Sequence, residues 1–186
     1  LYGSDFPDFS HGKELLRRLG ISDVGESRKL LIALGEWEPD ENVELLRAGV
    51  ISEFSQAEHA ACAGISGRPS DAEGREDLTN LPAVTIDGPF TRDFDDAVSL
   101  EIAPDGLVLG VHISDVSSAV PPDSPLDLAA AERASSLYLP RKVIPMLPPE
   151  LSPHTLSLVE GEARRAVSLI ARFDREGNLL KSRFTA

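Results

Sequence analysis

The sequence is short of cysteine, with Cys62 alone, so no disulfide can form within the chain. Proteins of oxidising compartments commonly carry paired cysteines, and a single thiol therefore favours the reducing cytoplasm. Long apolar runs are also missing, since no stretch approaches the roughly 18 to 20 apolar residues that cross a bilayer. The chain does not open with a basic segment followed by an apolar one. We therefore expect no secretory signal, no membrane partner and a cytoplasmic location.

Methionine is equally scarce, because Met146 is the only one and the chain begins at Leu1. Translation starts with methionine, so residue 1 is not expected to be the natural start. The sequence also stops at Ala186, directly after a stretch that predicts a strand. We expect a fragment of a longer protein, extended at both ends.

Basic residues are few, with 18 Lys and Arg against 31 Asp and Glu, for a net charge of −13. Taken alone, this balance disfavours nucleic acid, whose binding proteins usually present a basic face. The distribution is uneven, however, because residues 164–186 contain 6 bases and only 2 acids. An acidic protein can still bind RNA where cations neutralise its carboxylates and a local basic strip meets the phosphates. Most of the acids simply solubilise the surface.

The first third of the chain predicts short helices with glycine or proline at their junctions. Ser10 is the candidate N-cap of the first helix, and Ser55 with Glu58 matches a capping box before the fourth. Residues 1–66 are thus interpreted as a helical or winged-helix-like region, for which a packing role is favoured because its basic clusters are small. Residues 67–81 lack apolar periodicity and predict a linker. The four helices are expected at residues 11–19, 26–34, 40–49 and 55–63.

Residues 82–186 change to an α+β pattern with a largely antiparallel sheet. A helix is expected from Pro125 to about Ser136, with Ser124 as its N-cap, and residues 138–152 are expected to be irregular. Turn residues separate two pairs of strands, which predicts two hairpins. Strands are expected at residues 83–86, 96–102, 107–113, 166–173 and 179–184.

The stretch TIDGPFTRDFDDAV, residues 85–98, carries the candidate chemistry, because it places Asp87, Asp93, Asp95 and Asp96 within ten positions. Carboxylates this close repel one another, and a hard divalent cation such as Mg²⁺ would offset the repulsion. Such a cluster suits metal-assisted hydrolysis of a phosphodiester. In an extended segment Asp96 would point away from its neighbours, so the Gly88-Pro89 connection must let the chain bend for all four to converge.

Two other motifs that contain clustered aspartates fit this acidic stretch less well. An EF-hand loop starting at Asp93 fails, because Ala97 and Val98 occupy positions that require an oxygen ligand and a glycine. A D-x-D-x-T phosphatase motif fits poorly, because Ala97 stands in place of the threonine and Thr91-Arg92 precedes the first aspartate. The spacing alone leaves open a further alternative, in which the stretch is simply a solvent-exposed acidic loop.

Three longer runs carry a family resemblance. They are TIDGPFTRDFDDAVSLE (85–101), GVHISDVSSAVPPDSPLDLAAAERASSLYLPRKVIPMLPPELS (110–152) and SLVEGEARRAVSLI (157–170). In order and spacing they resemble the RNB-type catalytic domain of the ribonuclease II/R family of processive 3′→5′ exoribonucleases. Residues 34–55 resemble, more weakly, a segment upstream of that domain in some bacterial and organellar members.

The resemblance implies roles for individual residues. It makes Asp87 and Asp96 direct ligands of the main Mg²⁺, with Mn²⁺ as an alternative metal. It makes Asp95 the residue most critical to hydrolysis and Asp93 a supporting ligand. Tyr138 would stack on a base of the RNA, against the alternative of a core aromatic beside Leu137 and Leu139.

The resemblance also suggests surroundings for the site. Arg141 is a candidate phosphate contact, whereas His112, in an apolar strand, is expected to be a satisfied core residue rather than a catalyst. The implied activity releases nucleoside 5′-monophosphates from single-stranded RNA by a monomeric enzyme. The rest of the catalytic domain and an S1-type domain would follow Ala186, which leaves activity of these 186 residues alone in doubt. The rivals are a non-catalytic RNA-binding relative and another metal-dependent phosphodiesterase acting on DNA or small nucleotides.

Overall fold

The computed structural model describes residues 7–68, 74–89, 91–151 and 155–186. It divides into two compact units, Leu1–Ser52 and Glu53–Ala186, which are described separately. The expected linker at 67–81 lies inside the second unit, and its residues 69–73 fall outside the described ones. No helix among the described residues is both long and apolar enough to span a membrane.

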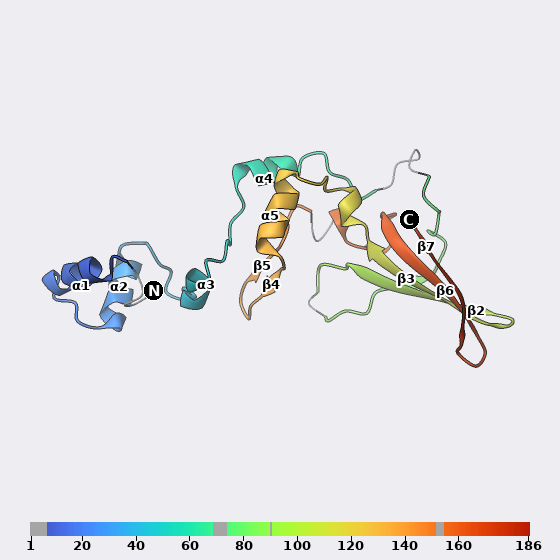
Figure 1. The fold of residues 1–186 in the computed structure, drawn as a ribbon, viewed down its shortest axis with the longest axis horizontal. Coiled ribbons are helices and arrows are strands. Elements are labelled where there is room, and N and C mark those ends of the chain that lie inside the picture. Colours follow the sequence, from blue (N-terminus) through green and yellow to red (C-terminus); the bar gives the residue numbers. More distant parts are fainter. Residues whose placement is uncertain (1–6, 69–73, 90, 152–154) are drawn as a thin grey trace. The chain divides into compact units, whose positions relative to one another are not determined.

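The described residues of the first unit form three helices, α1 (Phe9–Arg18), α2 (Val24–Ala33) and α3 (Val43–Arg47), drawn in blue and teal in Figure 1. Asp23 caps α2, because its side chain accepts a hydrogen bond from Glu26 N at 2.9 Å. The expected cap at Ser10 was wrong: α1 begins at Phe9, two residues earlier than expected, with no side-chain cap, and Ser10 lies inside the helix. Residues 7–52 contain helices and turns but no strand, which favours the helical alternative over the winged one.

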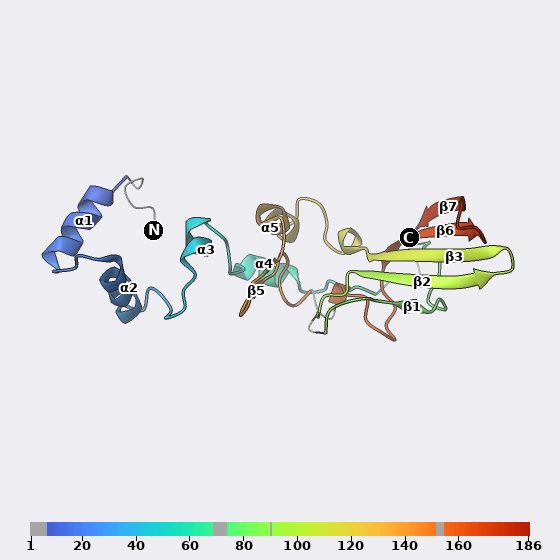
Figure 2. The same cartoon turned by 90° about the horizontal axis from the view of Figure 1, so that it is seen from below.

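The second unit is built on an antiparallel five-stranded sheet of order β1-β2-β3-β6-β7, which confirms the α+β expectation. The sheet lies at the end marked C in Figures 1 and 2. Two hairpins join β2 to β3 and β6 to β7, as the turn residues predict. The strands are β1 (Ala83–Val84), β2 (Asp96–Ala103), β3 (Gly106–Ser114), β6 (Ala166–Asp174) and β7 (Leu179–Thr185).

The two faces of the sheet differ in chemistry. One face carries Ser99, His112 and Ser168, all buried, on three neighbouring strands. The opposite face, which we call the apolar face, is made of large side chains that are 40 to 85% exposed. Its members include Leu100, Ile102, Ile113, Val167 and Phe184.

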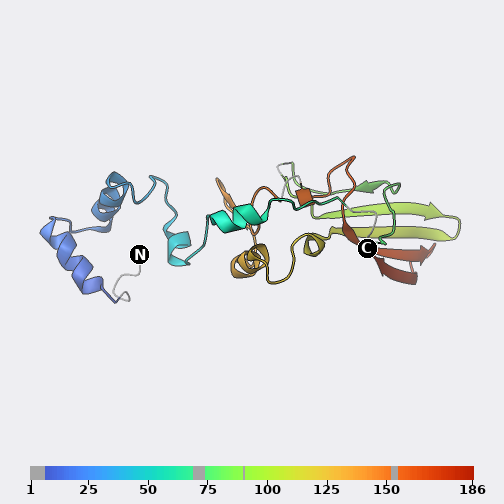
Figure 3. The same cartoon turned by 90° about the horizontal axis from the view of Figure 1, so that it is seen from above.

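Helices and short strands pack at one end of the sheet, as Figure 3 shows from above. They are α4 (Gln56–Ala61), a 3₁₀ turn η2 (Val116–Ser118), α5 (Pro125–Arg133), β4 (Leu137–Tyr138) and β5 (Val143–Ile144). Ser55 and Glu58 form the expected capping box of α4, and Ser124 caps α5. The expectation that 138–152 is irregular was partly wrong, because β5 pairs with β4. The apolar core of this region contains Cys62, Val120, Leu126, Leu151 and Leu156.

Arg133 explains why α4 belongs to the second unit. Its guanidinium, on a side chain only 5% exposed, donates to Glu53 O at 2.8 Å and pairs with Glu58 at 3.3 Å. It also lies 4.0 Å from the centroid of the Phe54 ring, a cation–π distance. The boundary between the compact units therefore precedes Glu53, well ahead of the linker predicted at 67–81.

Candidate active site

The four aspartates lie around one loop at the end of the sheet. Asp87 follows β1, Asp93 and Asp95 precede β2, and Asp96 is the first residue of β2. β1 and β2 pair antiparallel with Ala83 opposite Ser99 and Val84 opposite Val98. Continuing this register along the loop would place Asp87 opposite Asp95. Asp95 thus lies within electrostatic reach of Asp87, although eight positions separate them in the sequence.

The charges of the other three aspartates reach the carboxyl group of Asp95. The pKa of Asp95 is raised above its usual value, first by desolvation and then by the charges of Asp93, Asp96 and Asp87. Asp95 is exposed by surface area, but neighbouring protein atoms partly shield its carboxyl from water. Like charges at close range make ionisation costly, so a cation in their midst would relieve the repulsion.

The donor chemistry fits a hard divalent cation, for which carboxylate oxygens are preferred ligands. Within the described part of the chain, no three carboxylate, imidazole or thiol groups are grouped closely enough to hold an ion. Mg²⁺ often takes only one or two protein carboxylates, with water and substrate phosphate completing its coordination. Asp87, Asp93, Asp95 and Asp96 as ligands therefore remain a prediction, consistent with the donor set.

Tyr138 lies within electrostatic reach of the same acids. Its pKa is raised by partial shielding of the phenol and then by the negative charges of Asp93 and Asp95. Its side chain is 70% exposed, so the alternative of a core aromatic is wrong. An exposed ring beside an acidic cluster is well placed to stack on a base.

Arg141 lies in the turn of this hairpin and is exposed. It shares the hairpin with Tyr138. Its phosphate contact remains a prediction.

His112 is buried and doubly hydrogen-bonded, as expected of a core residue. Its Nε2 lies 2.9 Å from Ser99 Oγ and its Nδ1 2.8 Å from Ser168 Oγ. Gly110 leaves room for this contact, because a Cβ there would lie 2.3 Å from Ser99 Oγ and 2.6 Å from His112 Nε2. Both ring nitrogens are engaged within the sheet, which argues against a direct catalytic role.

The buried imidazole predicts a pH dependence of stability. Desolvation lowers the pKa of His112 below 6.5, so the unfolded chain binds a proton at pH values where the folded chain does not. Its contribution to stability is complete above pH 6.5 and is lost as the pH falls through the folded-state pKa. Thermal unfolding between pH 7.5 and 5 should show this loss, and His112→Gln should flatten the slope. His59→Gln, at an exposed histidine, is the control. If His112→Gln leaves the slope unchanged, other groups cause the pH dependence.

The sequence did not reveal which residues hold the acidic segment, residues 93–96, in place. Phe94 and Asp95 are hydrogen-bonded through their backbones to Ser157, Leu158 and Ser114. Ser157 is more than sixty positions from Phe94, and no local pattern marks a serine for such a contact.

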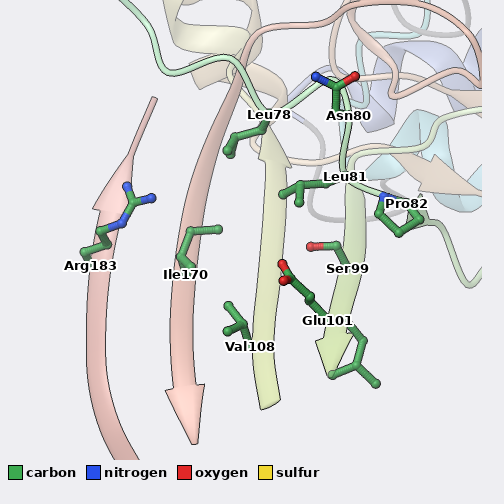
Figure 4. A pocket seen from close by; sticks show the side chains of 10 residues that line it. Leu78, Asn80, Leu81, Pro82, Ser99, Glu101, Val108, Ile170 and Arg183 are labelled. Atoms are coloured by element: carbon green, nitrogen blue, oxygen red, sulfur yellow. The ribbon is translucent and has the colours of Figure 1, made fainter. Parts of the chain in front are cut away.

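A separate pocket of about 430 Å³ lies over the sheet, between residues 78–82 and strands β2, β3, β6 and β7 (Figure 4). Leu78, Leu81, Val108 and Ile170 supply most of its apolar lining, with Glu101 and Arg183 as charged members. None of the predicted site residues lines it.

Comparison with known proteins identifies the family. The model of the RNB domain matches residues 75–186. A Synechocystis protein described as an uncharacterised ribonuclease is 36% identical over 178 residues, covering 92% of this chain and 27% of that protein. Ribonuclease R of Thermotoga maritima is 48% identical over 115 residues, covering 61% of this chain and 16% of that enzyme.

The fold comparison agrees. A solved structure of Mycoplasma genitalium RNase R in complex with double-stranded RNA superposes with a TM-score of 0.72 at 31% identity, covering 76% of this chain and 26% of that one. The fold thus matches that of an RNB-type nuclease domain. The chain belongs to the ribonuclease II/R family through its RNB domain, and it spans about a quarter or less of the length of these relatives.

Proposed function

We propose that the complete protein is a 3′→5′ exoribonuclease that hydrolyses single-stranded RNA to nucleoside 5′-monophosphates with the help of Mg²⁺. One observation carries the proposal: within an RNB domain, Asp95 lies within electrostatic reach of three other aspartates and of the exposed Tyr138. The same chemistry would accept Mn²⁺, which also prefers oxygen ligands.

The four aspartates would have different roles, according to their positions. Asp87 and Asp96, on the two arms of the loop, would hold the main cation, with Asp93 in support. Asp95 carries the raised pKa and would act closest to the hydrolytic step. When bound, the metal would activate a water and stabilise the leaving 3′ oxygen.

The substrate is inferred from the surroundings of the acids. Stacking on Tyr138 needs no particular base, because every base has a π-face, and Arg141 on the same hairpin would contact phosphate. RNase R of Mycoplasma genitalium has also been solved in complex with ribose-methylated single-stranded RNA. Single-stranded RNA of any sequence is the substrate this arrangement favours, for a protein acting as a monomer.

Replacing Tyr138 by alanine tests the stacking role. We expect the KM for RNA to rise by roughly 5- to 150-fold, because one base–aromatic stack contributes about 1–3 kcal/mol. Tyr138→Phe keeps the ring and should remain close to the parent. If Tyr138→Ala binds RNA as the parent does, the ring has no substrate role.

The activity itself is tested on 5′-labelled RNA and DNA oligomers of the same sequence, with Mg²⁺ or EDTA. The proposal expects RNA alone to shorten stepwise from its 3′ end, only with the metal, and to release nucleoside 5′-monophosphates. Equal degradation of DNA would instead support a different metal-dependent phosphodiesterase.

The fold alone does not decide for catalysis, because yeast Ssd1, described as a pseudonuclease, shares it with a TM-score of 0.57 at 23% identity. This chain carries the four acidic side chains, and ionisation of Asp95 beside the other three is costly without a cation. That cost favours an enzyme over a purely RNA-binding relative.

A further inference from the structure

A three-residue segment, 156–158, is hydrogen-bonded both to the acidic segment (residues 93–96) and to strand β3. Leu158 N donates to Phe94 O at 2.8 Å, and Phe94 N donates to Ser157 Oγ at 3.3 Å. Phe94 is therefore held on both its polar backbone atoms. Asp93 and Asp95 are its immediate neighbours, so these bonds limit where both carboxylates can go.

Strand β3 completes the support through Ser114. Ser114 N donates to Asp95 O at 2.8 Å, and Ser114 Oγ donates to Leu156 O at 2.6 Å. One buried serine thus ties the acidic segment and the 156–158 segment to the same point of the sheet. Ser114 is only 9% exposed, so water does not compete for these hydrogen bonds.

Ser157 is fixed from its other side as well. It is 1% exposed, and its neighbour Leu156 belongs to the apolar core. Arg164, with a side chain 9% exposed, donates from Nε to Ser157 O at 3.1 Å. The hydroxyl that accepts from Phe94 therefore sits on a backbone with little freedom to move.

We propose that Ser157 is a positioning residue of the active site: its buried hydroxyl holds Phe94 so that Asp93 and Asp95 face the position of the catalytic cation. This inference rests on the proposed function and deepens it. Ser157 touches neither substrate nor metal, and it acts only through the backbone of the acidic segment. Partners that orient metal ligands from behind commonly change metal affinity or activity by about 10- to 100-fold when removed.

The test compares Ser157→Ala with Ser168→Ala in the complete natural protein. Ser168 is a matched control, because it is 2% exposed and its hydroxyl also makes a buried hydrogen bond, but to His112 rather than to the acidic segment. For Ser157→Ala we expect kcat to fall about tenfold, the half-saturating Mg²⁺ concentration to rise about tenfold, and the KM for RNA to change little. Ser168→Ala should affect stability alone.

A readout without RNA follows the rise in melting temperature as Mg²⁺ is added, since ligand binding stabilises the folded state by mass action. Ser157→Ala should need about tenfold more Mg²⁺ for the same rise, whereas Ser168→Ala should follow the parent curve from a lower baseline. Should Ser157→Ala not fold, Ser157→Cys, which keeps the shape with a weaker acceptor, is measured in the same way and should shift in the same direction.

The outcomes separate this inference from the proposed function. If the Ser157 variants match the parent in Mg²⁺ dependence while Asp95→Asn is inactive, the positioning role is wrong and the function stands. A parallel loss in Ser157→Ala and Ser168→Ala would show that a buried hydroxyl matters only for stability, which also overturns the positioning role. Full activity of Asp95→Asn would remove the proposed function itself.

Discussion

Replacing Asp95 by asparagine is expected to reduce RNA hydrolysis by the complete protein on the order of 10²- to 10³-fold, the scale of losing one preorganised charge-stabilising group. Asparagine keeps the size of the side chain and removes its negative charge. The pKa of Asp95 is raised by burial and by three neighbouring acids, so its charge destabilises the folded state. The variant should therefore be as stable as the parent or more so. Initial rates on labelled RNA and thermal unfolding measure the two effects.

The combination of lost activity and retained stability separates a catalytic aspartate from a structural one. Asp123→Asn is the control, because Asp123 is an exposed aspartate in the turn before α5, outside the acidic loop. Rates of Asp95→Asn and Asp123→Asn that both equal the parent rate would support the non-catalytic RNA-binding alternative.

Gly67→Ala is expected to cause a large loss of stability in the second unit. Gly67 is buried, and a Cβ there would lie 1.7 Å from Thr155 O and 2.8 Å from its carbonyl carbon. Backbone atoms cannot rotate aside, and Gly67 O also accepts from Arg165 N at 3.1 Å. We expect a cost of about 3 kcal/mol or more, as for severe overpacking. Chemical denaturation of the second unit provides the measurement.

Gly12→Ala makes the same chemical change where space is open. Gly12 lies in α1, and nothing is within 4 Å of the added methyl group. Alanine is preferred over glycine in a helix by about 1 kcal/mol, so this variant should not weaken the second unit. A Gly67→Ala protein that unfolds at the parent's denaturant concentration would show that the 66–68 and 155–165 segments can move apart without cost.

Local patterns accounted for much of the architecture. The five strands of the sheet and the start of α5 follow from alternation, turn residues and caps, and the structure places them within a few residues of the expected bounds. The capping box of Ser55 and Glu58 formed as predicted, because both partners lie within one helical turn. Ser10 failed because α1 starts after Asp8 without using a side-chain cap at all.

Features that depend on residues far apart in the sequence could not be predicted from local patterns. The β4–β5 pair involves only two residues on each strand and is supported by Ser136 Oγ, which accepts from Met146 N at 3.0 Å. Arg133 holds the segment before α4 in the second unit through Glu53, which lies eighty positions away in the sequence. The acidic loop itself was visible because its members are close in sequence, whereas its support at Ser157 was not.

The apolar face of the sheet affects the solubility of the isolated chain. Leu100, Ile102 and Phe184 are each more than half exposed, and together with their neighbours they offer other molecules a broad water-repelling surface. What keeps separate copies apart is a net charge of −13, whose repulsion reaches only about 10 Å at 0.1 M ionic strength. Added electrolyte shortens that reach and leaves the attraction between such surfaces intact, so the isolated chain loses colloidal stability as salt rises.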